Sequence, residues 1–149
     1  MSMRPKKYIN HLTPAYVAKR KDHEGIEQRH LFSWMFACYR ELYDCAFHVP
    51  NGGHRHVAVA KKLKSEGVKA GVPDILILQP RGGYHGLAIE FKATPPKDAP
   101  VSESQLEWLN RLAENGYLSV VCRGTKAAKE TISNYAQLPV DQPCQTSTQ

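Results

Sequence analysis

The stretch Gly71–Ala93, GVPDILILQPRGGYHGLAIEFKA, decides the fold. Residues 74–78 and 86–91 are rich in apolar and β-branched side chains, which favour strands. A proline and two adjacent glycines between them are typical turn residues. This pattern predicts two short strands joined by a tight turn, that is, a β-hairpin.

The predicted hairpin brings two acids and a lysine together. Folding it about the Gly-Gly tip places Asp74, at the start of the first strand, beside Glu90, at the end of the second. Lys92 follows two residues later and points to the same face as Glu90. Two carboxylates so close repel each other, so at neutral pH they share a proton or bind a cation. Oxygen ligands suit Mg²⁺ or Mn²⁺, and a lysine beside such an ion can hold the attacking water.

At these residues the sequence resembles the PD-(D/E)XK nucleases, with Pro73-Asp74 and Glu90-Phe91-Lys92 as the two halves of the signature. More narrowly, it resembles the stand-alone VRR-NUC (virus-type replication-repair nuclease) domain of phages and prophages, from about residue 24 to residue 135. The resemblance implies a restriction-endonuclease-like α/β core, in which helices flank a central mixed β-sheet, and metal-dependent cleavage of DNA. Further matching residues are 49–53 with Arg55, 67–74, 82–86, and Gln105 with Trp108.

The resemblance also implies a ligand set for one metal ion or two. In the family, a helical glutamate followed four residues later by glutamine completes the metal site, and Glu24 with Gln28 has this spacing. Glu27 is the alternative, because it lies over the same apolar stripe. Acids in a first turn also simply suit the helix dipole. The predicted ligands are Glu24, Asp74, Glu90 and the backbone carbonyl of Phe91, and Lys92 would position the water.

Gln105 has two interpretations. It lies in a predicted helix over residues 102–115, where Ser102 and Gln105 fit a capping box. The resemblance implies instead a glutamine that faces the active site and binds water or phosphate. The two roles are compatible, so Gln105 joins Asp74, Glu90 and Lys92 as a predicted catalytic residue. Nucleases with a Gln-x-x-x-Tyr pattern differ, because this chain has Leu109 at the tyrosine position.

The rest of the pattern predicts one domain between two less regular ends. Residues 1–22 read as a basic arm, residues 23–138 as the nuclease domain, and residues 139–149 as a disordered tail. Within the domain, apolar spacing predicts helices over 24–43, 57–65 and 125–135, a short extended segment over 46–49, and a buried strand over 117–122.

A basic cluster makes a polyanionic partner plausible. The chain of 149 residues has a formal net charge of +6 and a pI near 9.2. A solvated helix face is one interpretation of the cluster. Its closeness in sequence to the acidic hairpin favours DNA phosphate binding instead. The predicted DNA-binding residues are Arg55, Lys61, Lys62, Lys64 and Lys69.

Composition predicts a cytoplasmic protein, in the bacterial host if a phage encodes it, with no membrane partner. Mean hydropathy is −0.48, and no apolar run is long enough to cross a bilayer. The N-terminus lacks the apolar core of a signal peptide. The four cysteines show no zinc-type spacing, which favours free thiols.

These observations predict a Mg²⁺- or Mn²⁺-dependent DNA endonuclease. One hairpin supplies one set of ligands, whereas resolving a four-way (Holliday) junction needs two symmetric cuts, so a homodimer is expected. The resemblance agrees, because stand-alone members of the family pair and act on junctions. An end-processing exonuclease or a nickase is the first alternative. A DNA-binding module without catalysis is the second.

Overall fold

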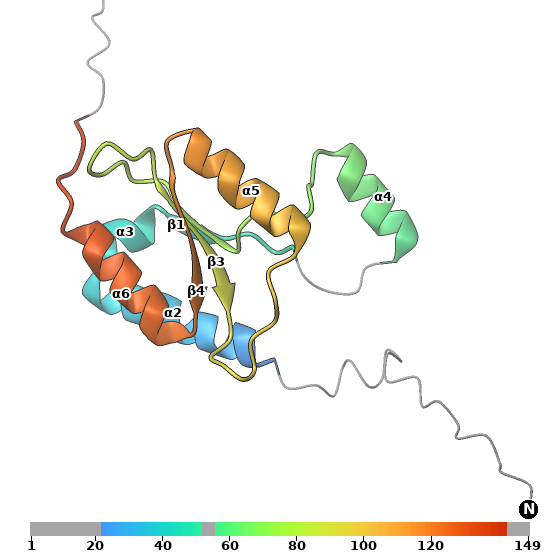
Figure 1. The fold of residues 1–149 in the computed structure, drawn as a ribbon, viewed down its shortest axis with the longest axis horizontal. Helices are drawn as coiled ribbons and strands as arrows, with labels where there is room; N and C mark the ends of the chain where they lie inside the picture. The colour runs from blue at the N-terminus through green and yellow to red at the C-terminus, as the bar shows by residue number, and fades with distance from the viewer. Residues whose placement is uncertain (1–21, 52–55, 143–149) are drawn as a thin grey trace, which may run out of the picture.

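The computed structural model describes residues 22–51 and 56–142 (Figure 1). Its centre is a mixed four-stranded sheet in the order β1-β2-β3-β4, which confirms the predicted α/β class. The strands are β1 (Ala46–His48), β2 (Ile75–Ile77), β3 (Leu87–Lys92) and β4 (Leu118–Arg123). The helices are α2 (His23–Cys38), α3 (Arg40–Asp44), α4 (Val57–Ser65), α5 (Glu103–Glu114) and α6 (Thr125–Ala136).

The predicted hairpin is β2 and β3, which pair antiparallel with Ile75 opposite Ile89. One step further along the same register, Asp74 lies opposite Glu90, as predicted. β1 extends the sheet antiparallel beyond β2. β4 lies parallel to β3 on the other side and is reached through α5, which agrees with the rule that parallel strands need a long connection.

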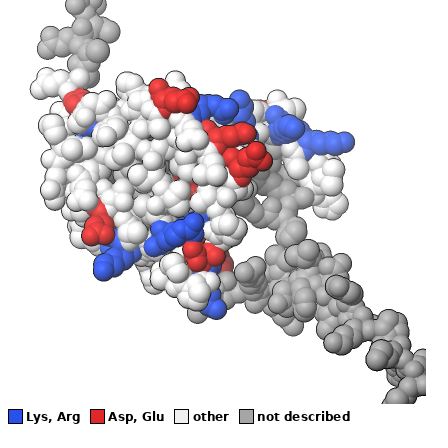
Figure 2. All heavy atoms as spheres, in the orientation of Figure 1, with Lys and Arg blue, Asp and Glu red and all other residues white. Residues whose placement is uncertain are grey.

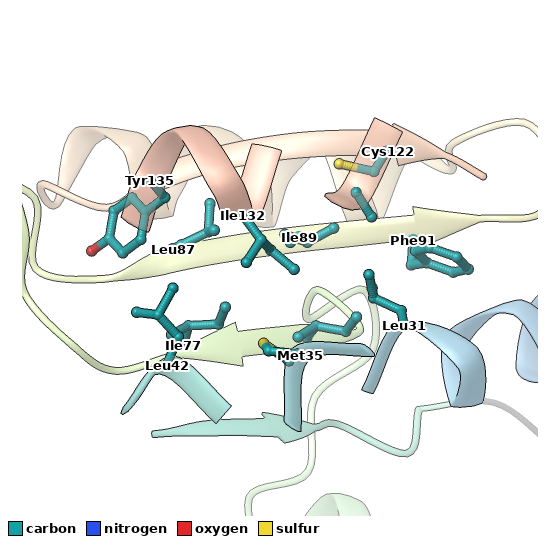
Figure 3. Close-up of a cluster of buried hydrophobic side chains, with 12 residues drawn as sticks. Leu31, Met35, Leu42, Ile77, Leu87, Ile89, Phe91, Cys122, Ile132 and Tyr135 are labelled. Carbon is teal, nitrogen blue, oxygen red and sulfur yellow. The ribbon is translucent and has the colours of Figure 1, made fainter. Parts of the chain in front are cut away.

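The two faces of β3 have different functions because successive side chains of a strand alternate. Leu87, Ile89 and Phe91 enter the hydrophobic core against side chains of α2, α3 and α6 (Figure 3). Glu90 and Lys92 therefore point to the opposite face. That face is covered by α5, which packs on β3 and β4. The catalytic candidates thus lie between the sheet and α5.

The predicted helix over 24–43 is wrong in one respect, because it divides into α2 and α3 at Tyr39. Asp22 caps α2, and its Oδ1 accepts the Gly25 N–H at 2.8 Å. Tyr39 has non-helical angles, φ −139° and ψ 61°, and its ring packs edge-on against Trp34. The break turns the chain so that β1 can join the sheet. The apolar spacing gives no sign of this break, because Leu42 beyond it is buried like Leu31 and Met35 before it.

The prediction of a buried last strand is also wrong. β4 is an edge strand of the sheet, and Cys122 is its one buried residue. Val121 is exposed. Among the described residues, Cys38, Cys45 and Cys122 are free thiols, as predicted. None of the described helices has the length and apolar character needed to cross a membrane.

The chain beyond α6 is held against the hairpin turn. Arg81 is buried, and its Nη1 donates to the carbonyls of Ala136 at 2.8 Å and Leu138 at 3.1 Å. Gly82 N–H donates to the Pro139 carbonyl at 2.9 Å. Gly83 N–H donates to Asp141 Oδ2 at 2.9 Å. The tail was predicted to begin at residue 139, but residues 139–142 belong to this bonded segment; residues 143–149 lie outside the described part.

Candidate active site

Asp74 lies at the entry to β2, directly after the buried Pro73. Its Oδ2 accepts the backbone N–H of Phe91 at 2.9 Å. The carboxylate is therefore fixed to the strand that carries Glu90. This bond explains why the two acids stay level with each other across the hairpin.

Glu90 is completely buried and makes two contacts through one oxygen. Its Oε1 accepts from Lys92 Nζ at 2.8 Å and from Gln105 Nε2 at 2.5 Å. Its Oε2 is buried and has no hydrogen-bond partner among the described residues. Burial raises the pKa of Glu90 to about 7; the charge of Asp74 acts in the same direction, and Lys92 opposes both. An orphaned buried carboxylate oxygen is costly unless a cation or a proton meets it.

Gln105 caps α5 and also faces the acid pair, as the two interpretations of the sequence predicted. Its Oε1 accepts the Ser102 N–H at 2.8 Å, and Ser102 Oγ accepts the Gln105 N–H, which completes the capping box of α5. Because the cap uses the amide oxygen, the amide NH₂ faces Glu90. The start of α5 thereby positions the buried carboxylate.

Glu24 and Glu27 have different surroundings in the structure. Glu27 accepts from Thr94 N–H at 2.8 Å and from Thr94 Oγ1 at 2.5 Å, so it fixes the chain just after β3. Glu24 faces the site: burial raises its pKa, the nearby Lys92 lowers it, and Asp74 raises it. The bonds to Thr94 thus give Glu27 a structural task and leave Glu24 as the candidate helical ligand.

A divalent cation fits the donors present. Within residues 22–51 and 56–142, no three His, Cys, Asp or Glu side chains are already grouped closely enough to hold a metal. Two facing carboxylates with an orphaned oxygen on Glu90 nevertheless form the kind of hard, oxygen-only donor set that Mg²⁺ or Mn²⁺ accepts. Glu24 lies close enough to influence both Asp74 and Lys92 electrostatically.

The predicted DNA-binding residues lie apart from this centre. Lys61, Lys62 and Lys64 are exposed on α4, and Lys69 is exposed in the loop that follows. In Figure 2 basic side chains lie on the upper part of α4 at the right of the molecule, and acidic side chains lie over the neighbouring α5. Arg55 lies outside the described residues.

Two residues that support Asp74 were not predicted. His48 Nδ1 lies 2.8 Å from the Asp74 carbonyl, so the ring donates there. Asn51 Nδ2 donates to the Val72 carbonyl at 2.7 Å. Both contacts join segments more than 20 residues apart, and nothing local in a single sequence pairs such residues. The one available signal was that both lie in or beside the matching segment 49–53.

The fold and the Asp-Glu-Lys arrangement together define a PD-(D/E)XK-type nuclease core. The family model of the VRR-NUC domain matches residues 12–126. A solved structure described as a VRR_NUC domain protein is similar, with 31% sequence identity and a TM-score of 0.69, over 83% of this chain and 99% of that chain. No curated protein matches. The chain belongs to the VRR-NUC family, so its broad function is that of a DNA-processing nuclease.

Proposed function

We propose that the chain is a Mg²⁺- or Mn²⁺-dependent DNA endonuclease. The observation that supports this most strongly is the convergence of Asp74, Glu90 and Lys92 at one end of the hairpin, with Lys92 Nζ 2.8 Å from Glu90. A strand with a purely structural role has no reason to bury a glutamate and a lysine together, since burying charges costs free energy. A functional site provides that reason.

Glu24, Asp74, Glu90 and the carbonyl of Phe91 would hold the cation. When bound, it would neutralise charge on the scissile phosphate and lower the pKa of a bound water. The chain supplies the remaining functions. Gln105 holds Glu90 in place, and the Phe91 N–H holds Asp74.

Lys92 acts on the attacking water. The residue is 5% exposed, and its ammonium has three N–H donors, of which the structure commits one to Glu90. The others can orient the water and stabilise the negative charge that develops on the phosphate. Lys92 is therefore a catalytic residue in this proposal, and not a metal ligand.

The proposed substrate is branched DNA, such as a four-way junction, cut by a homodimer. The described part of one chain carries one acid pair, the pair Asp74 and Glu90. Two symmetric cuts require two such pairs and therefore two chains. The exposed lysines of α4 would contact phosphates outside the active site. An end-processing exonuclease is the alternative within the same chemistry, and no contact in the structure favours it.

The test is cleavage of labelled DNA by wild type and by Asp74→Ala with Mn²⁺ present. Removing this carboxylate should abolish cleavage, while DNA binding stays equal or becomes tighter because repulsion of phosphate is relieved. Glu103→Ala on α5, which removes an exposed acid, is the matched control and should cleave like wild type. Cleavage by Asp74→Ala at the wild-type rate would overturn the site assignment.

A further inference from the structure

The segment 56–71, here called the α4 arm, leaves the domain through a closed base. On one side Asn51 is bonded to the Val72 carbonyl at 2.7 Å. On the other, Gly71 (φ +82°) lies so close to α5 that a Cβ there would be 2.5 Å from the backbone of Ser104. The two ends of the excursion are thus fixed side by side. Figure 1 shows α4 standing away from the sheet at the right of the molecule.

The α4 arm exposes an apolar surface. α4 has no buried residue, and Val57 is 71% exposed. At 100° per residue, Val57, Ala60, Leu63 and Lys64 lie on one side of the helix, and Lys61 and Lys62 point away from the centre of this side. Between it and the returning loop is an open groove of about 540 Å³, lined by the apolar Ala60, Leu63, Val68 and Ala70 and by the polar Asn51, Lys64 and Lys69. A nine-residue helix is not stable in water without packing, so this side requires a partner.

A second apolar surface lies on the sheet and is here called the β1–β2 patch. It consists of Phe47, Leu76 and Leu78. Phe47 and Leu76 are paired across the strands, and Leu76 is paired with Ala88. The patch therefore lies on the same face of the sheet as Glu90. α5 packs only on the β3–β4 half of that face, among the contacts of the described elements. Phe47 is 43% exposed and Leu78 is 50% exposed.

We propose that these two surfaces meet between two copies of the chain: the α4 arm of each copy packs on the β1–β2 patch of the other. This inference rests on the proposed homodimer and assigns its interface. The two surfaces match in shape, since one is a groove and the other a set of projecting side chains. They also match in chemistry, since the patch is apolar and the lining of the groove is mainly apolar. DNA is a poor partner for this apolar patch, because the surface of DNA presents charged phosphates.

Two further features favour exchange over closure within one chain. The closed base holds α4 beyond the start of α5, and Figure 1 shows α4 apart from the sheet. Two-fold symmetry also repeats the contact, so each side chain counts twice toward the roughly 1,200–2,000 Å² that stable interfaces bury. Lys61 and Lys62 face away from the contact and remain available for phosphate.

The test uses two variants that each damage one of the two surfaces. Leu63→Asp alters the α4 arm, and Phe47→Asp alters the β1–β2 patch. In a homodimer of either variant both copies of the contact are damaged, so the dissociation constant measured by sedimentation should rise about a hundredfold or more. Ala58→Asp, on the outer side of α4, and Leu106→Asp, on the exposed face of α5, introduce the same charge elsewhere and should leave the dimer intact.

Mixing the two variants provides the decisive measurement. A pair formed from one Leu63→Asp chain and one Phe47→Asp chain has one undamaged contact, between the normal arm of the second and the normal patch of the first. The mixture should therefore dimerise more tightly than either variant alone. Dimerisation of Phe47→Asp as tight as wild type, or a mixture no tighter than its components, would overturn the proposed interface.

A crosslink that needs no destabilising change gives a second measurement. In a background with Cys38, Cys45 and Cys144 changed to Ser, Val68→Cys and Leu78→Cys chains should form a mixed dimer with a short bismaleimide. Lys61→Cys in place of Val68→Cys should not. If wild type is a monomer, this inference and the proposed dimer both fail, while cleavage that depends on Asp74 would still support the nuclease. If wild type is a dimer without the mixed crosslink, this inference alone fails.

Discussion

At the scale of single residues, Glu90 makes the stability of the protein depend on pH. Its pKa is about 7 in the folded chain, against 4.5 when unperturbed. Between these two values the folded state binds more protons than the unfolded state, so the free energy of unfolding falls as pH rises from 4.5 to 7. The slope cannot exceed about 1.4 kcal/mol per pH unit for one group.

Glu90→Gln should remove this slope, because the amide does not titrate. Urea denaturation of metal-free wild type and Glu90→Gln at pH 4.5, 6 and 7.5 measures it. Glu24, whose pKa is also raised by burial, is present in both proteins and cancels in the comparison. Equal slopes in the two proteins would show that Glu90 ionises normally.

The two acids of α2 give a second prediction at this scale. Glu24→Gln should weaken Mn²⁺ affinity at least about tenfold, because it removes a charged ligand next to Asp74 and Lys92. Glu27→Gln should leave the affinity nearly unchanged but lower the free energy of unfolding by about 1 kcal/mol, through weaker bonds to Thr94. Titration calorimetry and urea denaturation measure the two effects. The reverse order of affinities would assign the ligand role to Glu27.

At the scale of elements, the first turn of α5 connects a helix cap to the active site. Ser102→Ala removes only the side-chain half of the cap, and should cost about 1 kcal/mol of stability with cleavage close to wild type. Gln105→Ala removes the other half of the cap, its bond to the Ser102 N–H, together with the support of Glu90, and should also lower kcat at least about tenfold. Single-turnover cleavage at saturating DNA concentration compares the rates of the two variants. Equal rates would mean that Gln105 is only a cap.

The features that could be predicted are those whose sequence signals lie within a few residues of one another. The hairpin, the capping box of α5 and the acid pair depend on turn residues, on a three-residue spacing and on strand alternation. The break at Tyr39 was not predictable, because the apolar spacing continues through it to Leu42. The exposure of β4 depends on which strand lies at the sheet edge, and the bonds of residues 139–142 depend on a partner more than 50 residues away.

At the scale of the whole molecule, the exposed lysines of α4 should govern how binding responds to salt. Changing Lys61 and Lys62 together to Ala should reduce the slope of log affinity against log salt by about 2, the value for two phosphate contacts. The expected substrate order is a four-way junction before linear duplex of the same sequence. Filter binding over a salt series and cleavage of strand-labelled junctions measure both.

Arg40→Ala, which removes one basic side chain from α3, is the control and should change the salt slope by one contact at most. An unchanged slope in the double variant would mean that these lysines of α4 do not contact DNA. Nicking of linear duplex as readily as a junction would leave the nuclease but assign it a different substrate.

The buried Arg81 also determines when during synthesis the hairpin can be completed. The carbonyl acceptor on Ala136 is made 55 residues after Arg81, which at ribosomal speed is a delay of roughly 3–11 seconds. During this interval the guanidinium has Gln79 and Glu41 as acceptors but lacks the carbonyls of Ala136 and Leu138, and the turn between β2 and β3 lacks its outer support. The hairpin that presents Asp74 and Glu90 is therefore fully supported only after Leu138 has been made, so a nascent chain that ends before this residue does not yet carry a finished nuclease site.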